Sequence, residues 1–266
     1  MRKIASACLA AKAHYLDITG EIAVFESVLA RDAEAKRAGV ALLPGVGFDV
    51  VPTDCLAALL HEQLPDATEL QLAFHAPRAG LSRGTMKTVL EGIGDGGAIR
   101  RDGRIVRVPT AYDVREIPFS SGPRTAMTIP WGDVATAFHT TGIPNIRVYR
   151  STSPKTIRRM RLMRPLLPLA SWRPIARYLD QRANQIAGPN AEHRAQSRMY
   201  LWGRVTNARG DEKTMTLTVS EGYTFTVESA LLAVQRVLAA PRAGAFTPAR
   251  FFGPRFVFEV PGTTQP

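Results

Sequence analysis

The sequence predicts an α/β protein in which a parallel sheet is followed by a larger α+β part. Near the start, a β-like segment, "HYLDIT", and a short apolar run, "VALLPGVGF", alternate with segments of helical spacing. This β-α-β-α order is typical of parallel strands joined by crossover helices. After Pro65 the order changes to β-rich runs joined by turns, which favours a largely antiparallel sheet. We therefore divide the chain into residues 1–65 and 66–266.

The elements of the first part follow from hydrophobic spacing and helix-capping residues. The opening "MRKIASACLAAKA" predicts the end of a helix and not a signal peptide, because its apolar stretch is brief. Residues 22–29 have helical spacing, and Gly39 suits the end of that helix. "VALLPGVGF" predicts a strand buried on both faces. Pro52 begins the next helix, with Thr53 or Asp54 as its N-cap.

In the second part, β-rich and helical patterns alternate with proline-broken segments. Asn207 to Asp211 separates two β-rich runs, which predicts a hairpin. The remaining expected elements are strands in "ATELQLAFHA", "RIVRVPTAYDVREIPF", "NIRVYRSTS" and "RFVFEV", and helices in "TMKTVLEGI" and "TVESALLAVQRVLAA".

The composition argues against a membrane-spanning protein and against a metal-binding protein. No apolar run approaches the roughly 18 residues that a membrane span needs. The two cysteines and five histidines lack metal-binding spacing, so we expect no metal site and reduced thiols in a cytoplasmic protein. The net charge of +11 is concentrated between Lys155 and Arg182, where eight basic residues face one acid. This basic helical insertion covers about residues 153–185.

Two short motifs match known patterns in unfavourable contexts. The G-x-G-x-x-G at residues 92–97 follows a helical run, the reverse of the dinucleotide-binding order, which favours a helix-ending loop. The G-x-S-x-G around Ser82 lies between a strand and a helix, and Asp133 and His139 follow in the order of a hydrolase triad. No oxyanion loop precedes it, so Ser82 or Thr85 as a helix cap is the competing interpretation.

The segment "PGVGFDVVPTD" is the strongest local candidate for a site. It lies where a parallel strand ends and a helix begins, the place where open α/β sheets bind ligands. Gly45 and Gly47 permit close approach of the backbone to a ligand, and Asp49 presents a carboxylate there. A tight turn whose aspartate caps the next helix is the alternative.

Together, "HYLDITGE" and "PGVGFDVVPTD" resemble the saccharopine dehydrogenase-like oxidoreductases, especially the branch with trans-acting enoyl reductases. The resemblance continues through "SRGT", "IPWGDVATAFHTTGIPNIRVY", "EGYTFTVESALLAVQRVL" and "TPARFFGPRFVFEVPG". It implies that residues 1–65 are the C-terminal part of a Rossmann-type domain. Only thirteen residues precede "HYLDITGE", so we expect a truncated chain without the pyrophosphate-binding motif. The strands at 14–19 and 41–46 would then have open edges and promote association.

The resemblance also implies hydride transfer, including enoyl reduction, between NAD(P)H, with NADP favoured, and a small or lipid-linked substrate. In a truncated chain we expect this activity to be impaired. It suggests His14, Asp49 and Arg83 as catalytic, with Tyr15 a further candidate proton donor. Trp131 is expected in the core more than in the substrate wall, as is Tyr149. The cofactor-binding residues implied are Asp17, Thr19, Gly20, Glu21, Gly45, Gly47 and Phe48.

Three expectations concern partners and alternative functions. The basic stretch at 155–182 suggests contact with a membrane surface, in keeping with lipid metabolism, and a solvated helical face is the alternative. A homodimer is expected, and nucleic-acid binding is not, since no recognition motif is present. The competing functions are a non-catalytic remnant that acts as a peripheral membrane module, and a serine hydrolase at Ser82.

Overall fold

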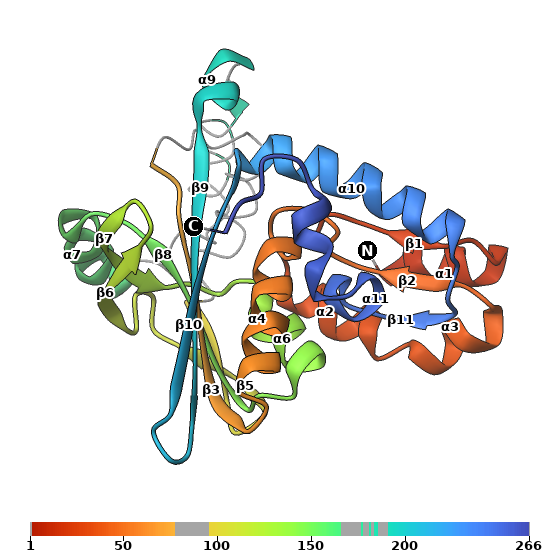
Figure 1. The fold of residues 1–266 in the computed structure, drawn as a ribbon, viewed down its shortest axis with the longest axis horizontal. Coiled ribbons are helices and arrows are strands. Elements are labelled where there is room, and N and C mark those ends of the chain that lie inside the picture. Colours follow the sequence, from red (N-terminus) through yellow and green to blue (C-terminus); the bar gives the residue numbers. More distant parts are fainter. Residues whose placement is uncertain are drawn as a thin grey trace.

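The computed structural model describes residues 2–77, 96–165 and 191–265, together with residues 177, 181, 184 and 185. Ser82, Arg83, Thr85, the helix expected in "TMKTVLEGI" and most of the G-x-G-x-x-G motif lie outside the described residues. Within the described part, two sheets are present, a three-stranded sheet A and an eight-stranded sheet B (Figure 1).

Sheet A is parallel and brings together the two ends of the sequence. Its order is β1 (Tyr15–Leu16), β2 (Ala41–Leu43) and β11 (Gly244–Ala245), with β2 in the centre. The helices α2 (Ile22–Leu29) and α3 (Asp32–Ala38) connect β1 to β2. This arrangement confirms the predicted parallel sheet with crossover helices. The β11 strand belongs to sheet A although it lies beyond residue 66, and the division at residue 65 stays a prediction.

Sheet B is mixed and mostly antiparallel, as expected. Its main order is β10-β9-β3-β8-β4-β5, and the β6–β7 hairpin joins it through β8. Within sheet B, β3 and β8 form the only parallel pair among the strands described. The strands are β3 (Ala67–His75), β4 (Gly97–Arg101), β5 (Arg104–Val108), β6 (Val114–Phe119), β7 (Gly122–Thr128), β8 (Asn145–Ser151), β9 (Arg198–Asn207) and β10 (Glu212–Ser220).

The two faces of sheet B carry different side chains. Leu72 and Phe74 of β3 belong to the main core, beside α4 (Val51–Gln63) and α6 (Asp133–Thr141). Figure 1 shows these helices between sheet B and sheet A. Gly203 of β9 permits this packing, because a Cβ atom there would lie 2.6 Å from Leu60 Cδ1 of α4. The opposite face has a smaller core of Ala73, Ile117, Phe119, Ala126, Tyr149 and Trp202.

Six further helices are present in the described part of the chain. They are α1 (Arg2–Ala11), α7 (Pro154–Met163), α9 (Ala191–Gln196), α10 (Gly222–Ala239), α11 (Pro248–Phe252) and the 3-10 helix η2 (Pro254–Glu259). The longest, α10, has an exposed apolar stripe of Val227, Leu231, Val234 and Leu238. Among the described residues, none of the helices has the length and apolar character needed to cross a bilayer.

Two local predictions are confirmed and three are wrong. Gly39 ends α3 with a left-handed φ of 73°, although the single helix expected before it is divided into α2 and α3, and β9 and β10 form the predicted hairpin. The helix α4 begins before Pro52, so Thr53 and Asp54 lie inside its first turn and neither is the N-cap. "RFVFEV" lies in η2 because Pro254 starts a helical turn after Gly253. The edge expected at 41–46 is not open, since β11 pairs with β2.

Arg100 of β4 connects sheet B to the helices α2 and α6. Its buried guanidinium donates hydrogen bonds to Val134 O of α6 at 2.8 Å and to Gly103 O at 2.7 Å. It also forms an ion pair with Glu26 of α2 at 2.8 Å, and it stacks over the Phe138 ring. One side chain therefore links α2, α6 and β4.

Replacing Arg100 with Met should destabilise the fold by about 3 kcal/mol, because two buried carbonyl groups lose their donor and Glu26 loses its partner. Arg101→Met is the matched control: this neighbouring arginine is exposed, and its loss should cost less than about 0.5 kcal/mol. Urea unfolding of the two variants and the parent protein measures both values. Equal stabilities for the two variants would contradict the role of Arg100.

Candidate functional site

The Asp17 carboxylate joins the loops that follow β1 and β2. Its Oδ1 atom accepts hydrogen bonds from Thr19 N at 3.0 Å and Gly45 N at 2.8 Å. Its Oδ2 atom accepts one from the Tyr15 hydroxyl. The Val46 N–H also donates to the Asp17 backbone carbonyl at 2.8 Å. These bonds hold the C-terminal ends of both strands together and form one edge of sheet A.

Asp49 lies at this edge as a carboxylate without a hydrogen bond or ion pair to any described residue. It lies deep between the two loops while retaining partial exposure to solvent. Gly20 makes room for it, since a Cβ atom on residue 20 would lie 2.7 Å from Asp49 Oδ2. Burial raises the pKa of Asp49 to about 6. A carboxyl group with this pKa can both donate and accept a proton near neutral pH.

Two further aspartates lie behind Asp49, but they are fully buried and have structural partners. Asp54 accepts hydrogen bonds from the Thr140 hydroxyl at 2.5 Å and from Ala249 N at 2.8 Å. Asp133 accepts one from the Thr53 hydroxyl at 2.8 Å. Burial raises the pKa of Asp54 to about 6 and that of Asp133 well above its usual value. These groups fix α4 against α6 and α11, which leaves Asp49 as the acid that faces solvent.

An aromatic cluster adjoins the Asp49 loop. The Phe48 ring packs edge-on against Phe74 and Phe225, with centroids 6.0 Å and 6.1 Å away. The Trp131 ring lies 4.8 Å from Phe74 and is only partly buried. The end of β3 therefore brings an apolar wall to the edge of sheet A.

The structure places His14 and Asp49 at opposite ends of sheet A. The residue pair Tyr15–Leu42 sets the parallel register, so His14 lies at the N-terminal end of β1. Its Nδ1 atom accepts a hydrogen bond from Ala41 N at 3.0 Å. His14 and Asp49 are therefore not brought together. Tyr15 is buried against Asp17, and burial raises the pKa of its hydroxyl above the ordinary value.

Protein side chains occupy the space beside Gly45 and Gly47. A Cβ atom on Gly45, where φ is 77°, would lie 2.7 Å from the Phe25 ring. A Cβ atom on Gly47 would lie 2.9 Å from the Thr226 methyl group of α10. Phe48 N donates to the Thr226 hydroxyl at 3.0 Å. The close approach expected at these glycines is thus made by α2 and α10.

Thr19 and Glu21 complete the loop after β1. The buried Thr19 hydroxyl accepts a hydrogen bond from Glu21 N at 3.2 Å, which begins α2. The Glu21 side chain is exposed and makes no capping bond. Of the predicted site residues that the structure describes, Gly20, Glu21 and Asp49 are therefore the ones whose position at the edge leaves them open to a ligand. The assignment of cofactor and catalytic roles stays a prediction.

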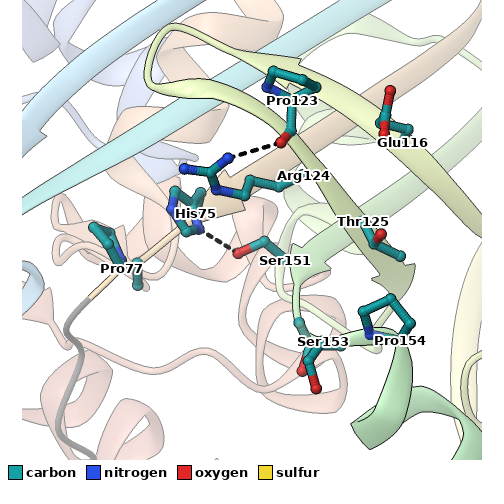
Figure 2. A pocket seen from close by; sticks show the side chains of 11 residues that line it. His75, Pro77, Glu116, Pro123, Arg124, Thr125, Ser151, Ser153 and Pro154 are labelled. Atoms are coloured by element: carbon teal, nitrogen blue, oxygen red, sulfur yellow. Dashed lines mark hydrogen bonds between the residues drawn. The ribbon is translucent and has the colours of Figure 1, made fainter.

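A cavity of about 460 Å³ lies on the other face of sheet B (Figure 2). His75 Nδ1 and Ser151 Oγ are 2.6 Å apart within it, and burial lowers the pKa of His75. No described carboxylate bonds to His75, so this pair lacks the third group of a hydrolase triad. Asp133 and His139 do not supply one, since Asp133 bonds to Thr53 and His139 lies 3.4 Å from Glu26. None of the predicted site residues in the described part of the chain lines the cavity.

No family model and no curated protein matches the sequence. Among solved structures, the chain is similar to apo saccharopine dehydrogenase (L-Glu forming) from Saccharomyces cerevisiae, with a TM-score of 0.57 and 10% identity. The match covers 97% of this chain and 78% of that one. It supports the α/β fold described above, including the Rossmann-like part.

Two other similarities are looser. GenD2 from gentamicin A biosynthesis, in complex with NAD, has a TM-score of 0.32 at 13% identity. The match covers all of this chain and 75% of GenD2. The putative oxidoreductase YvaA from Bacillus subtilis has a TM-score of 0.29 at 12% identity, with 100% and 77% coverage. At these TM-scores neither structure carries an argument about the fold or the site.

Replacing Asp49 with Asn should change how stability depends on pH. An unfolded aspartate releases its proton near pH 3.8, whereas folded Asp49 retains it to about pH 6. The folded protein therefore binds more protons between these values, and its stability falls as the pH rises through that window. Asp49→Asn should thus stabilise the protein by about 3 kcal/mol at pH 7 and by nothing below about pH 3.5.

Urea unfolding between about pH 3.5 and 7 tests this expectation. Glu62→Gln removes an exposed acid from α4 and serves as the control, with a curve that parallels that of the parent protein. A curve for Asp49→Asn that is also parallel to the parent's would show that the Asp49 carboxyl is not buried in the manner described.

Proposed function

We propose that this chain is a saccharopine dehydrogenase-like, NAD(P)-dependent oxidoreductase with its reaction centre at Asp49. The observation that carries the proposal is the position of Asp49, an unpaired carboxylate at the C-terminal edge of a parallel sheet. Open α/β sheets bind their ligands at this edge. The similarity to the fold of yeast saccharopine dehydrogenase also supports a ligand site at this edge of sheet A. Enoyl reduction of a lipid-linked substrate is the finer form of the proposal, with NADP as the favoured cofactor.

The exposed residues of this edge suit the ring end of a nicotinamide cofactor. Ile18 is 57% exposed and lies against Gly47, so it offers apolar surface to a ring. Glu21 and Asp49 offer carboxylates to the polar substituents around it. A bound nicotinamide cofactor supplies the hydride. Asp17, by contrast, has both oxygens engaged within the loop, and its role under this proposal is to hold the edge in shape.

Asp49 would hold or release the proton that accompanies hydride transfer. Its raised pKa of about 6 keeps a fraction of the group protonated near neutral pH, so it can serve as an acid. The wall of Phe48, Phe74 and Trp131 would exclude water from one side of the substrate. Exclusion of water strengthens the electrostatic contribution of a nearby carboxyl group.

Titration with NADPH, followed by a panel of α,β-unsaturated acyl thioesters at 340 nm, tests the proposal. We expect weak but saturable NADPH binding, and a rate of oxidation that falls about 100-fold in Asp49→Asn while NADPH affinity changes little. Glu62→Gln is again the matched control and should retain the parent's rate. The proposal fails if the parent protein does not bind nicotinamide cofactors, or if Asp49→Asn reacts as fast as the parent.

A second proposal concerns a lipid surface contact through α7. Leu162 is 80% exposed and Met163 41% exposed, and both lie close in sequence to the exposed Arg158 and Arg159. Apolar side chains among cations are typical of helices that lie on anionic membranes. Not all of the basic residues are available, because Arg161 and Arg164 donate to the backbone carbonyls of the 110–111 loop.

Co-sedimentation with vesicles that contain phosphatidylserine tests this contact. Each exposed cation contributes about 1 kcal/mol near an anionic surface, so Arg158→Gln/Arg159→Gln should weaken binding roughly 30-fold at low salt. Arg101→Gln/Arg104→Gln removes the same charge from exposed positions on β4 and β5 and should have little effect. Equal losses in the two double variants would show a response to net charge and not a contact at α7.

A further inference from the structure

Arg150, at the C-terminal end of β8, is a partly buried cation without an acidic partner. The structure shows no hydrogen bond and no ion pair from its guanidinium to any described residue. Two other arginines of the same sheet that are not fully exposed have acidic partners: Arg100 pairs with Glu26 at 2.8 Å, and Arg115 with Asp113 at 2.9 Å. Arg147, on the opposite face of β8, lies 3.7 Å from the same Asp113.

The strand register places Arg150 on the face of sheet B that looks toward sheet A. Side chains alternate along β8, so Arg150 shares the face of Val148, which belongs to the main core. Arg150 lies beside Phe74 of β3 in the parallel register. Phe74 in turn contacts Trp131 and the Phe48 ring. Arg150 is therefore next to the aromatic wall that adjoins the Asp49 loop.

The first turn of α10 also reaches this place. Tyr223 is the titratable neighbour that favours the charged form of Arg150. The residue before it, Gly222, lies against the Phe48 ring, with a constructed Cβ atom 3.5 Å from that ring. The cation, a tyrosine and the aromatic wall thus come from β8, α10 and the Asp49 loop, three segments that are distant in the sequence.

Keeping an unpaired guanidinium in such a place has a free-energy cost. Burial disfavours the charged form and lowers the pKa of Arg150 from its ordinary value. An apolar residue at this position would pack without that cost, as the neighbouring Phe74 and Val148 do. Groups that are unfavourable for folding and lie beside a site are typical of ligand recognition.

We propose that Arg150, with Tyr223 beside it, binds an oxyanionic group of the substrate, a carboxylate or a phosphate. The planar guanidinium matches the paired oxygens of either group. The ligand would neutralise the cation that no described acid neutralises. This inference rests on the proposed function, since it places the reacting part of the same substrate toward Asp49. It defines the substrate class as an anionic molecule with an apolar segment against the aromatic wall.

Calorimetric titration with glutarate and, separately, inorganic phosphate tests the proposal without any nucleotide. We expect the parent protein to bind at least one of the two, and Arg150→Met to weaken that binding by about 10-fold or more. Arg104→Met makes the same charge change at an exposed position of β5 and should leave binding within about 2-fold of the parent. The anion that binds more tightly identifies the oxyanion as carboxylate or phosphate.

The melting temperature of ligand-free Arg150→Met provides a readout that does not depend on binding. It should rise, because the variant no longer buries an unpaired cation. A lower melting temperature would show that the guanidinium is structural, and would overturn the proposal. Absence of binding by the parent at about 50 mM of both anions, or equal binding by Arg150→Met, would also overturn it. Because no hydride transfer is measured, a failure of the oxidoreductase proposal is seen separately, in the NADPH titration.

Discussion

The hydrogen bonds of the Asp17 carboxylate determine the geometry of the candidate site. They connect the loop after β1 to Gly45 at the end of β2, across a sheet whose paired segments are only two residues long. With so few backbone bonds between the strands, a charged acceptor shared by both loops is a large part of what holds this edge together. The positions of Gly20 and Asp49, which lie against each other, follow from it.

Charged groups serve two different purposes around this edge. Arg100 and Glu26 are paired and connect three elements, so they contribute to a defined packing of the two parts. Asp49 and Arg150 have no such partners among the described residues. Burial raises the pKa of Asp49 and lowers that of Arg150, so it favours the neutral form of each side chain. Arg100 and Glu26 therefore stabilise the fold, whereas Asp49 and Arg150 are candidates for binding a ligand. An acid and a cation on two sides of one aromatic wall form an arrangement suited to an anionic, partly apolar substrate.

The sequence predicted what depends on local pattern and missed what depends on distant pairing. A β-like segment and an apolar run identified β1 and β2, and Gly39 was recognised because a left-handed residue at a helix end favours glycine. The two-residue strand β11 has no periodic signal, and it is defined only by its bonds to β2. "RFVFEV" alternates like a strand, yet the preceding proline directs it into η2. His14 lies at the N-terminal end of β1, away from Asp49, and Arg150 lies beside Phe74. Neither position could be predicted without the register of the strands.

The place of β11 in sheet A has a consequence for how the chain folds. The amide groups of Gly244 and Phe246 donate to the carbonyl groups of Val40 and Leu42, so about 200 residues separate the two partners. On the ribosome, β1 and β2 are synthesised before β11, so the second side of β2 stays without its partner until β11 has been synthesised. Contacts of such long sequence separation form slowly, because a large loop must close first. Sheet B has mainly closer pairings, and it can therefore form while the sheet that carries Asp49 is still incomplete.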